Sequence, residues 1–299
     1  MSSAEYVTQQ LINALSAGSV YALIAVGLAM VFGILRLVNF AHGDLMMVGA
    51  YFALFLLTAG VNFWVVLLAT MVAVAMSGVI MERVAYRPIR GAADVAMLLT
   101  SFAVTIFLEN GVILTLSSRS RPLPVPDFLT RVYHPHGNLF IPAVNVWAMV
   151  AAVVSMVLLT LFVTRTTIGL SMRAAAEDLM AAELMGININ TVVAVAFAIG
   201  SAMAAVAGLI WGVRAGKVDP FMGFFPVLKA FVASVIGGFG TIPGAVVGGY
   251  ALGILEIMLQ ALLPTALSPY RDAFVFIVLI IILLVRPNGI LGAAETETV

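Results

Sequence analysis

The chain contains no cysteine and very few charged residues. Only 9% of its 299 residues are Asp, Glu, Lys or Arg, whereas an average soluble domain carries roughly 25%. The absence of cysteine excludes disulfides, zinc–thiolate sites, iron–sulfur clusters and a Cys nucleophile. The formal net charge is zero, which argues against nucleic acid as a partner. With 63% hydrophobic residues and a mean hydropathy of +1.15, the composition predicts an all-α, polytopic integral membrane protein.

The sequence also lacks the common enzyme signatures. No G-x-x-x-x-G-K-[ST] phosphate loop, H-E-x-x-H or G-x-S-x-G motif occurs, and the one Gly-Lys pair, Gly216-Lys217, is followed by Val218. We therefore predict that the chain has no catalytic residues and no cofactor of its own. If such a membrane protein moves solutes, it depends on an ion gradient, on passive flow or on a partner that supplies energy.

Two histidines, His134 and His136, form an H-P-H pair with a spacing that could hold a metal ion. No third ligand lies beside them, and a protein metal site needs at least three. We interpret them as an incidental surface pair and predict no metal site.

Apolar segments of about 20 residues are long enough to cross a bilayer as helices. The chain carries nine candidates, at 11–35, 43–60, 62–81, 94–116, 143–163, 191–212, 224–239, 243–263 and 272–285. The segments 224–239 and 272–285 are short, which is typical of broken or re-entrant helices. We expect about 8–10 transmembrane helices within a single membrane domain that spans residues 1–299.

Small residues recur every four positions in the later segments. This spacing lets helix backbones approach closely in lipid, where no hydrophobic effect drives helices together. It predicts a tightly packed bundle and carries no chemistry by itself. The residues concerned are Gly200, Ala204, Gly208 and Gly212, then Gly244 with Gly248, and Gly249 with Gly253.

The longest polar connection, residues 117–142, is rich in proline and is predicted to be an extended loop outside the cell membrane. The polar segment 173–188 is predicted to lie on the opposite, cytoplasmic side. This orientation leaves slightly more Arg and Lys inside than outside, including the basic cluster E-R-V-A-Y-R-P-I-R at 82–90.

Residues 173–188 are predicted to form one short helix outside the bilayer. A stripe of Ala175, Leu179, Ala182 and Gly186 falls on one helical face, and small residues there would let another protein approach closely. We place Glu177 and Asp178 in the first turn, where carboxylates suit the helix dipole. Gly186 is expected to end the helix, and Asn188 or Asn190 to cap the next one. The alternative is an ordinary solvated connector.

Polar side chains at membrane depth are costly and tend to serve function. The V-N-F-A-H-G-D stretch, with Asn39, His42 and Asp44, is either a connection at the membrane surface or a break that lines a transport path. Lys229 either extends to the outer interface, which we favour, or pairs with a carboxylate. The remaining candidates are Glu109 with Asn110, and Glu256 with Gln260.

Six ordered motifs resemble the LivH-type permeases, the membrane subunits of branched-chain amino acid ABC importers. The resemblance runs nearly from end to end. The motifs are G-S-V-Y-A-L-I-A-V-G-L-A-M-V-F-G (18–33), N-F-A-H-G-D-L-M-M-V-G-A-Y (39–51), E-R-V-A-Y-R-P-I-R (82–90), R-A-A-A-E-D-L-M-A-A-E-L-M-G-I-N (173–188), L-K-A-F-V-A-S-V-I-G-G-F-G-T-I-P-G-A-V-V-G-G (228–249) and R-P-N-G-I-L-G (286–292).

The resemblance implies that 173–188 is a coupling helix, which docks on an ATP-binding subunit and transmits its closure to the spans. It implies leucine, isoleucine and valine as substrates and a bacterial plasma (inner) membrane location. The implied partners are a second, LivM-like permease in a hetero- or homodimer, two ATP-binding subunits that bind ATP and Mg²⁺, an extracytoplasmic substrate-binding protein and membrane lipid. The coupling residues are Arg173, Ala175, Glu177, Asp178, Leu179, Ala182 and Gly186.

For the translocation path our hypothesis is that Asn39, His42, Asp44 and Lys229 line or gate it. Related permeases carry other amino acids, urea or short amides, so these cargoes remain alternatives. An ion-coupled secondary transporter that uses Glu109, Lys229 and Glu256, or a passive channel for small neutral solutes, would also be polytopic. Neither rival explains a segment shaped to dock on a cytoplasmic partner.

Overall fold

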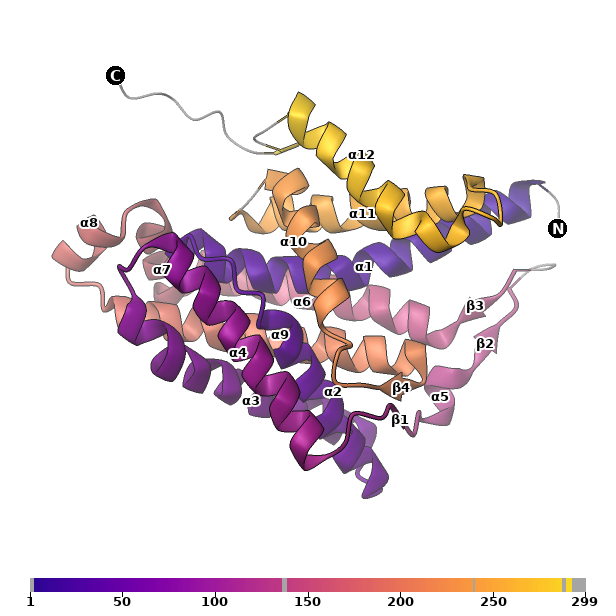
Figure 1. Ribbon diagram of the computed structural model, residues 1–299, viewed down its shortest axis with the longest axis horizontal. Coiled ribbons are helices and arrows are strands. Elements are labelled where there is room, and N and C mark those ends of the chain that lie inside the picture. The colour runs from indigo at the N-terminus through magenta and orange to yellow at the C-terminus, as the bar shows by residue number, and fades with distance from the viewer. Residues whose placement is uncertain (1–2, 136–138, 239, 287–288, 292–299) are drawn as a thin grey trace.

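The computed structural model describes residues 3–135, 139–238, 240–286 and 289–291. Within these ranges the chain is almost entirely helical (Figure 1), which confirms the all-α prediction. The α-helices are α1 (Ser3–Leu35), α2 (His42–Thr58), α3 (Phe63–Met81), α4 (Asp94–Thr115), α5 (Asp127–Thr130), α6 (Ala143–Arg165), α7 (Thr167–Glu177), α8 (Leu179–Leu184), α9 (Ile189–Ala215), α10 (Phe224–Gly238), α11 (Ile242–Leu262) and α12 (Arg271–Val285).

Short turns and strands join these helices. A single π-helical turn, η1 (Glu82–Tyr86), extends α3, and the 3₁₀ turns η2 (Arg87–Ile89) and η3 (Ser268–Tyr270) precede α4 and α12. The strands have two residues each: β1 (Arg121–Pro122), β2 (Val132–Tyr133), β3 (Ile141–Pro142) and β4 (Lys217–Val218).

Each of the nine predicted apolar segments forms a helix. Six helical stretches in the described chain are long and apolar enough to span a membrane: Glu5–Leu35, Phe63–Ile89, Asp94–Thr115, Ala143–Arg165, Ile189–Ala215 and Ile242–Leu262. The helices α2 and α10 are apolar but shorter, with 17 and 15 residues, and α12 has 15. The chain is thus a multi-pass membrane protein with three short helices among its long spans.

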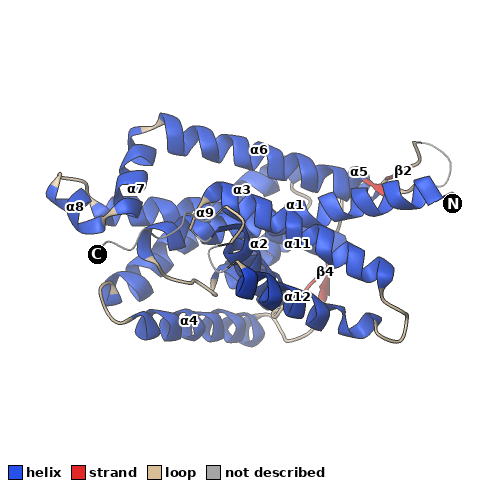
Figure 2. Cartoon of the chain, turned by 90° about the horizontal axis from the view of Figure 1, so that it is seen from above, coloured by secondary structure: helices blue, strands red, loops and turns tan. Residues whose placement is uncertain are grey.

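The centre of the bundle is made by α1 and α9. The most apolar stretch of α1 is 89% buried inside the protein, against 17% for α4. Figure 2 shows α6 and α4 on opposite sides of this centre. Because lipid surrounds the outer helices, their apolar side chains stay exposed to it, whereas most of α1 and 72% of the corresponding stretch of α9 are buried.

Glycines set the distances between the central helices. A Cβ atom added to Gly200 of α9 would lie 2.8 Å from the backbone oxygen of Gly27 in α1. One added to Gly249 of α11 would lie 2.5 Å from the backbone nitrogen of Ala22 in α1, and Gly248 faces α10 in the same way. Any side chain at these positions would push the helices apart, so the predicted close packing is confirmed.

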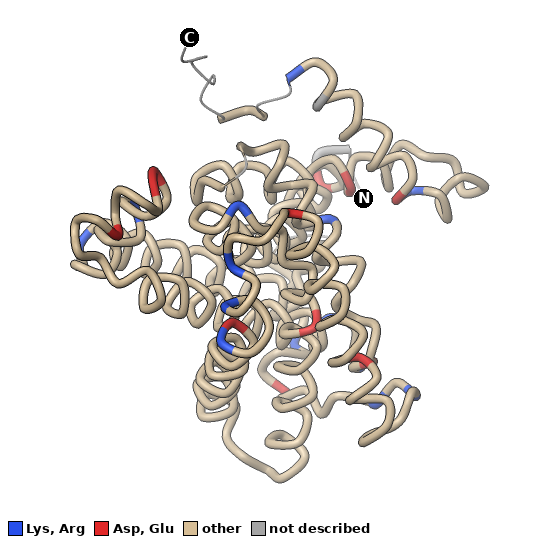
Figure 3. The backbone as a smooth tube through the Cα atoms, turned by 60° about the vertical axis from the view of Figure 1, so that its left-hand side comes forward, with Lys and Arg blue, Asp and Glu red and all other residues tan. Residues whose placement is uncertain are grey.

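The polar connections lie at two opposite ends of the molecule (Figure 1). The segment 117–142 contributes β1, which pairs antiparallel with β4 (Arg121 opposite Val218), and the β2–β3 pair. The helices α7 and α8 lie at the other end. His136 is outside the described residues, and His134 stacks edge-on against Phe140. Charged residues are sparse along the tube, and long helical stretches carry none (Figure 3).

Candidate functional site

The V-N-F-A-H-G-D stretch forms the connection from α1 to α2 and the first turn of α2. Its three polar side chains are enclosed by protein, with exposed fractions of 1% for Asn39, 1% for His42 and 2% for Asp44. The stretch is therefore not a solvent-exposed connection. The stretch is a helix break buried inside the bundle.

Two hydrogen bonds fix this break to its surroundings. The Tyr86 hydroxyl of η1 donates to Asn39 Oδ1 at 2.8 Å, and the Phe40 backbone N–H donates to Ser101 Oγ of α4 at 2.7 Å. Sequence reasoning missed Tyr86 and Ser101. The only signal for Tyr86 was its place in the 82–90 motif, and a serine within an apolar span has no distinctive spacing.

His42 and Asp44 carry polar atoms that have no hydrogen-bond partner among the described residues: His42 Nε2 and Asp44 Oδ2. The His42 ring lies so close to α1 that a Cβ at Gly27 would be 2.8 Å from Nε2. The side chains that act on Asp44 are Thr105 and Glu109, both on α4. The Thr105 hydroxyl makes no hydrogen bond either. The Asp44 carboxyl group thus lies near a hydroxyl and a second carboxylate, and no described residue forms an ion pair with it.

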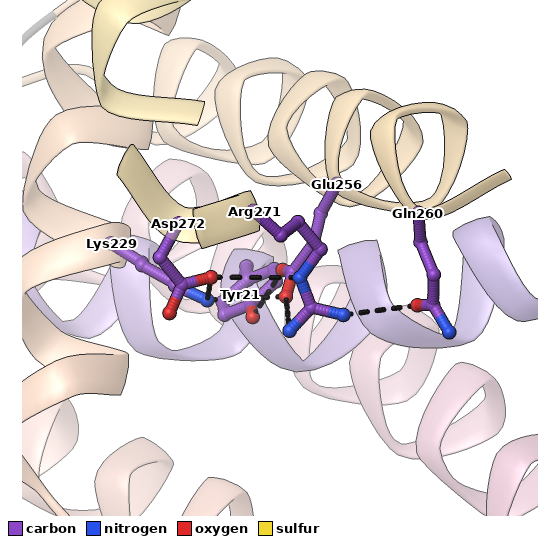
Figure 4. A network of polar contacts seen from close by, with 6 residues as sticks. All are labelled: Tyr21, Lys229, Glu256, Gln260, Arg271 and Asp272. Carbon is purple, nitrogen blue, oxygen red and sulfur yellow. Dashed lines mark hydrogen bonds and ion pairs between the residues drawn. The ribbon is translucent and has the colours of Figure 1, made fainter. Parts of the chain in front are cut away.

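Lys229 of α10 belongs to a different polar cluster, shown in Figure 4. Its Nζ lies 3.1 Å from Glu256 Oε1 of α11 and 2.9 Å from Asp272 Oδ1 of α12. Our preference for extension to the outer interface was wrong: Lys229 is buried and pairs with carboxylates. The reason is that α11 and α12 place two carboxylates beside it, and a paired charge is far less costly to bury than an isolated one.

Glu256 is the centre of this charge cluster. Besides Lys229, it accepts from the Tyr21 hydroxyl of α1 at 2.5 Å and from Arg271 Nη2 of α12 at 2.9 Å. Arg271 also donates to Gln260 Oε1 at 3.0 Å. The cluster joins α1, α10, α11 and α12, and it contains none of Asn39, His42 and Asp44.

The 82–90 motif forms a compact ion-pair turn between α3 and α4. Glu82 is completely buried and accepts from Arg87 Nη2 at 2.7 Å and Arg90 Nη2 at 2.6 Å. Arg90 Nη1 reaches Asn190 Oδ1 at the start of α9, at 2.8 Å. The motif thereby ties the α3–α4 turn to the central helix.

The segment 173–188 is not one helix. The chain is already helical from Thr167, and it breaks at Asp178, whose side chain accepts from the backbone N–H groups of Met180 (2.8 Å) and Ala181 (3.0 Å). Aspartate favours this N-cap position over a helix interior. Glu177 therefore ends α7 instead of starting a helix, which corrects our placement of both carboxylates in a first turn.

The C-terminal end of the segment is as predicted. Gly186 adopts a left-handed φ of +85°. Its N–H donates to Glu183 O and the Ile187 N–H to Ala182 O, the two hydrogen bonds of a Schellman motif. Asn188 then caps α9 through the Thr191 N–H at 3.1 Å.

The predicted small-residue stripe is only partly available for docking, because Gly186 is exposed but its two alanines are not. Ala175 and Ala182 are buried against the protein itself. The outward surface of α8 and the turn after it is made by Met180, Leu184 and Met185, which are 74%, 84% and 83% exposed. Small residues were expected to admit a partner, but they are what allows α7 and α8 to pack on their own bundle.

The long apolar spans, with polar groups buried between them and the arm α7–α8 at one end, define a multi-pass membrane protein. The family model described as "Branched-chain amino acid transport system / permease component" matches residues 10–283. The chain belongs to this family of transport permeases.

Individual relatives agree with this assignment. The chain is 41% identical to the high-affinity branched-chain amino acid transport system permease protein LivH of Escherichia coli (strain K12), over 98% of both chains. It is 38% identical to the corresponding protein BraD of Pseudomonas aeruginosa, over 97% of both. Among solved structures, PsaBC from Streptococcus pneumoniae in complex with Fab shares the fold, with a TM-score of 0.50 and 12% identity over 92% of this chain and 91% of that one.

Proposed function

We propose that this chain is the membrane-spanning permease subunit of an ABC importer for leucine, isoleucine and valine in a bacterial plasma membrane. The similarity to LivH and BraD over nearly the full length of each chain carries this proposal. ATP and Mg²⁺ are bound by two separate ATP-binding subunits. A second, LivM-like permease and an extracytoplasmic substrate-binding protein complete the assembly.

The arm α7–α8 is the coupling element of this proposal. It lies at the end of the molecule opposite the strands, and it exposes three large apolar side chains, Met180, Leu184 and Met185, beside the charged Glu177 and Asp178. Exposed apolar side chains with a polar rim are typical of protein contact sites. The arm packs on the bundle through Ala175, Leu179 and Ala182. Arg173 lies before this contact in the chain and Gly186 after it.

The transport path passes the buried break at the start of α2. Asn39, His42 and Asp44 carry the polar atoms there, and the unpartnered His42 Nε2 and Asp44 Oδ2 support a role in contacting cargo or water. The glycine contact between Gly43 and Gly223 brings the start of α10 against this point. Lys229 supports the path from the other face of α10, through its two ion pairs.

Co-purification tests the assembly. Tagged protein in mild detergent should retain a second permease and two ATP-binding subunits, and leucine-loaded binding protein should stimulate ATP hydrolysis by the complex. Stimulation by a urea-loaded binding protein alone would support the importer assembly but identify urea as its substrate. A chain that purifies alone and transports without ATP would overturn the proposal.

The coupling role is tested by Leu184→Glu. A charge in the apolar contact should abolish stimulated ATP hydrolysis and uptake, while the amount of chain in the membrane stays unchanged. Thr167→Glu is the matched control, because it adds the same charge to the exposed first turn of α7, where a carboxylate suits the helix dipole. Equal uptake by both variants would contradict the docking role of α8.

A further inference from the structure

A cavity of about 310 Å³ lies between α1, α9, α11 and α12, at the end of the molecule that carries the strands. This volume is at the lower end of the roughly 300–1,000 Å³ found for small-molecule pockets. The polar and aromatic side chains on its wall are Tyr21, Trp211, Arg214, Glu256, Gln260 and Arg271. Four residues of Figure 4 therefore line the cavity, namely Tyr21, Glu256, Gln260 and Arg271. Arg214 of α9 also lines it.

Among the charged side chains of the cavity wall and the adjoining cluster, cations outnumber carboxylates by one. The cluster holds the cations Lys229 and Arg271 against the carboxylates Glu256 and Asp272. Arg214 adds a further cation. It is an exposed residue whose electrostatic neighbours are Tyr21 and Glu256, and among the described residues its guanidinium makes no direct hydrogen bond or ion pair. A guanidinium recognises a carboxylate or a phosphate through two parallel hydrogen bonds.

The rest of the wall suits a small molecule with an aliphatic part. The Trp211 ring lies at a centroid distance of 6.4 Å from the Tyr21 ring, inclined by 53°, and Ala17 and Ile257 complete the apolar lining. Gln260 Oε1 accepts one hydrogen bond, from Arg271, and a carbonyl oxygen has room for a second donor. The wall thus offers a cation, an apolar surface and an amide oxygen.

We infer that this cavity binds a zwitterionic aliphatic amino acid, with Arg214 on its carboxylate, Gln260 Oε1 on its ammonium group and Trp211 against its side chain. This inference rests on the proposed function and deepens it, since it assigns a substrate-binding site to the permease at the end opposite the α7–α8 arm. Glu256 is already saturated by its three partners, so its part is to hold Arg271 and Tyr21 in place.

The test measures leucine binding to the assembled complex in nanodiscs of phosphatidylcholine, without the substrate-binding protein. Arg214→Gln should weaken leucine binding roughly 10- to 100-fold, the effect of losing a charge-assisted hydrogen-bond pair. Arg119→Gln removes an exposed arginine from the 117–142 loop at the same end, outside the cavity, and should leave leucine binding unchanged. Arg214→Lys should recover part of the loss, because it keeps the charge without the planar geometry.

Two leucine analogues test which group of the ligand Arg214 binds. Binding of 4-methylpentanoate, which lacks the ammonium group, should depend on Arg214 as leucine binding does. Binding of 3-methylbutylamine, which lacks the carboxylate, should be weak and equal in wild type and Arg214→Gln. Leucine binding that is the same in the Arg214→Gln and Arg119→Gln complexes would overturn the inference.

A lipid phosphate is the other source of an anionic group at this depth. If the wild-type complex binds no leucine in phosphatidylcholine, and phosphatidylglycerol co-purifies with the wild type but not with Arg214→Gln, the cavity is a lipid site and the inference fails. ATP-dependent leucine uptake by the wild-type complex is measured in parallel. Its loss would count against the proposed function, whereas uptake with leucine binding independent of Arg214 would count against the cavity alone.

Discussion

Two carboxylates are buried among the spans, and their surroundings are opposite. Glu256 is enclosed by Lys229, Arg271 and the Tyr21 hydroxyl, so both of its oxygens accept hydrogen bonds. Asp44 has an oxygen without a partner, and the side chains that act on it are the Thr105 hydroxyl and the Glu109 carboxylate. Both oxygens of Glu256 are paired, although Arg271 Nε in the same cluster makes no hydrogen bond. The network around Asp44 is an open one.

The difference separates a carboxylate that joins helices from one that keeps an oxygen free. A buried charge with all its partners joins helices, and its removal leaves other charges stranded. A buried polar atom without partners lowers stability and does not join helices. The charge cluster around Glu256 holds α1, α10, α11 and α12 together, and the α2–α4 contact at Asp44 keeps hydrogen-bonding capacity for water or cargo.

The largest expected effect is on stability, from Glu256→Gln. The amide keeps the shape but leaves Lys229 and Arg271 to share Asp272, which is half exposed. We expect the free energy of unfolding to fall by about 3 kcal/mol, the range for breaking a buried ion pair. Thermal or denaturant unfolding in detergent measures it. Glu183→Gln, at an exposed position, is the control and should change the free energy of unfolding by less than about 0.5 kcal/mol. Equal effects of the two variants would show that the ion pairs of Glu256 do not stabilise the fold.

The second prediction concerns Asp44→Asn. Because Asp44 Oδ2 has no partner, the neutral amide should leave the free energy of unfolding within about 1 kcal/mol of wild type or raise it. Leucine uptake should fall roughly tenfold or more, since a charge-assisted contact to the passing ammonium group is lost. Glu109→Gln, one turn beyond Thr105 on α4, should reduce uptake less. A strong loss of stability in Asp44→Asn would show that its carboxylate has a structural partner.

The smallest effect is expected from Thr105→Val, which removes only the hydroxyl. The folded protein should be as stable as wild type, because Thr105 Oγ1 makes no hydrogen bond. Uptake should fall by roughly two- to tenfold, the value of one neutral hydrogen bond. Thr100→Val on the same helix is the control, because the Thr100 hydroxyl donates a hydrogen bond to the Ala96 carbonyl of its own helix. Unchanged uptake in Thr105→Val would limit the open network to Asp44.

Much of the architecture was predictable from residues close together in the chain. The nine apolar segments, the Gly186 stop and the Asn188 cap depend on local hydropathy and local hydrogen bonds. The glycine spacing predicted close packing because the period of the helix decides which residues share a face. Asn39, His42 and Asp44 were found because a polar run inside apolar sequence is conspicuous.

The direction of a helical face was not predictable. The stripe of Ala175 and Ala182 has the correct period, but the period is the same whether a face meets its own bundle or a partner. Only the packing of α7 and α8 showed that the stripe is internal and that Leu184 and Met185 point outward. The break at Asp178 was missed for a related reason: an aspartate within a helical pattern can lie in a first turn or cap a new helix.

By itself the sequence determined the class of protein, the positions of its spans and its family, because hydropathy and motifs are properties of short stretches. Only the tertiary structure decided the partners of the buried charges. Lys229 meets Glu256 and Asp272, 27 and 43 residues further along the chain, and Asp44 meets Thr105 of another helix. In a bilayer each helix forms on its own, and which polar groups meet depends on how the finished helices pack.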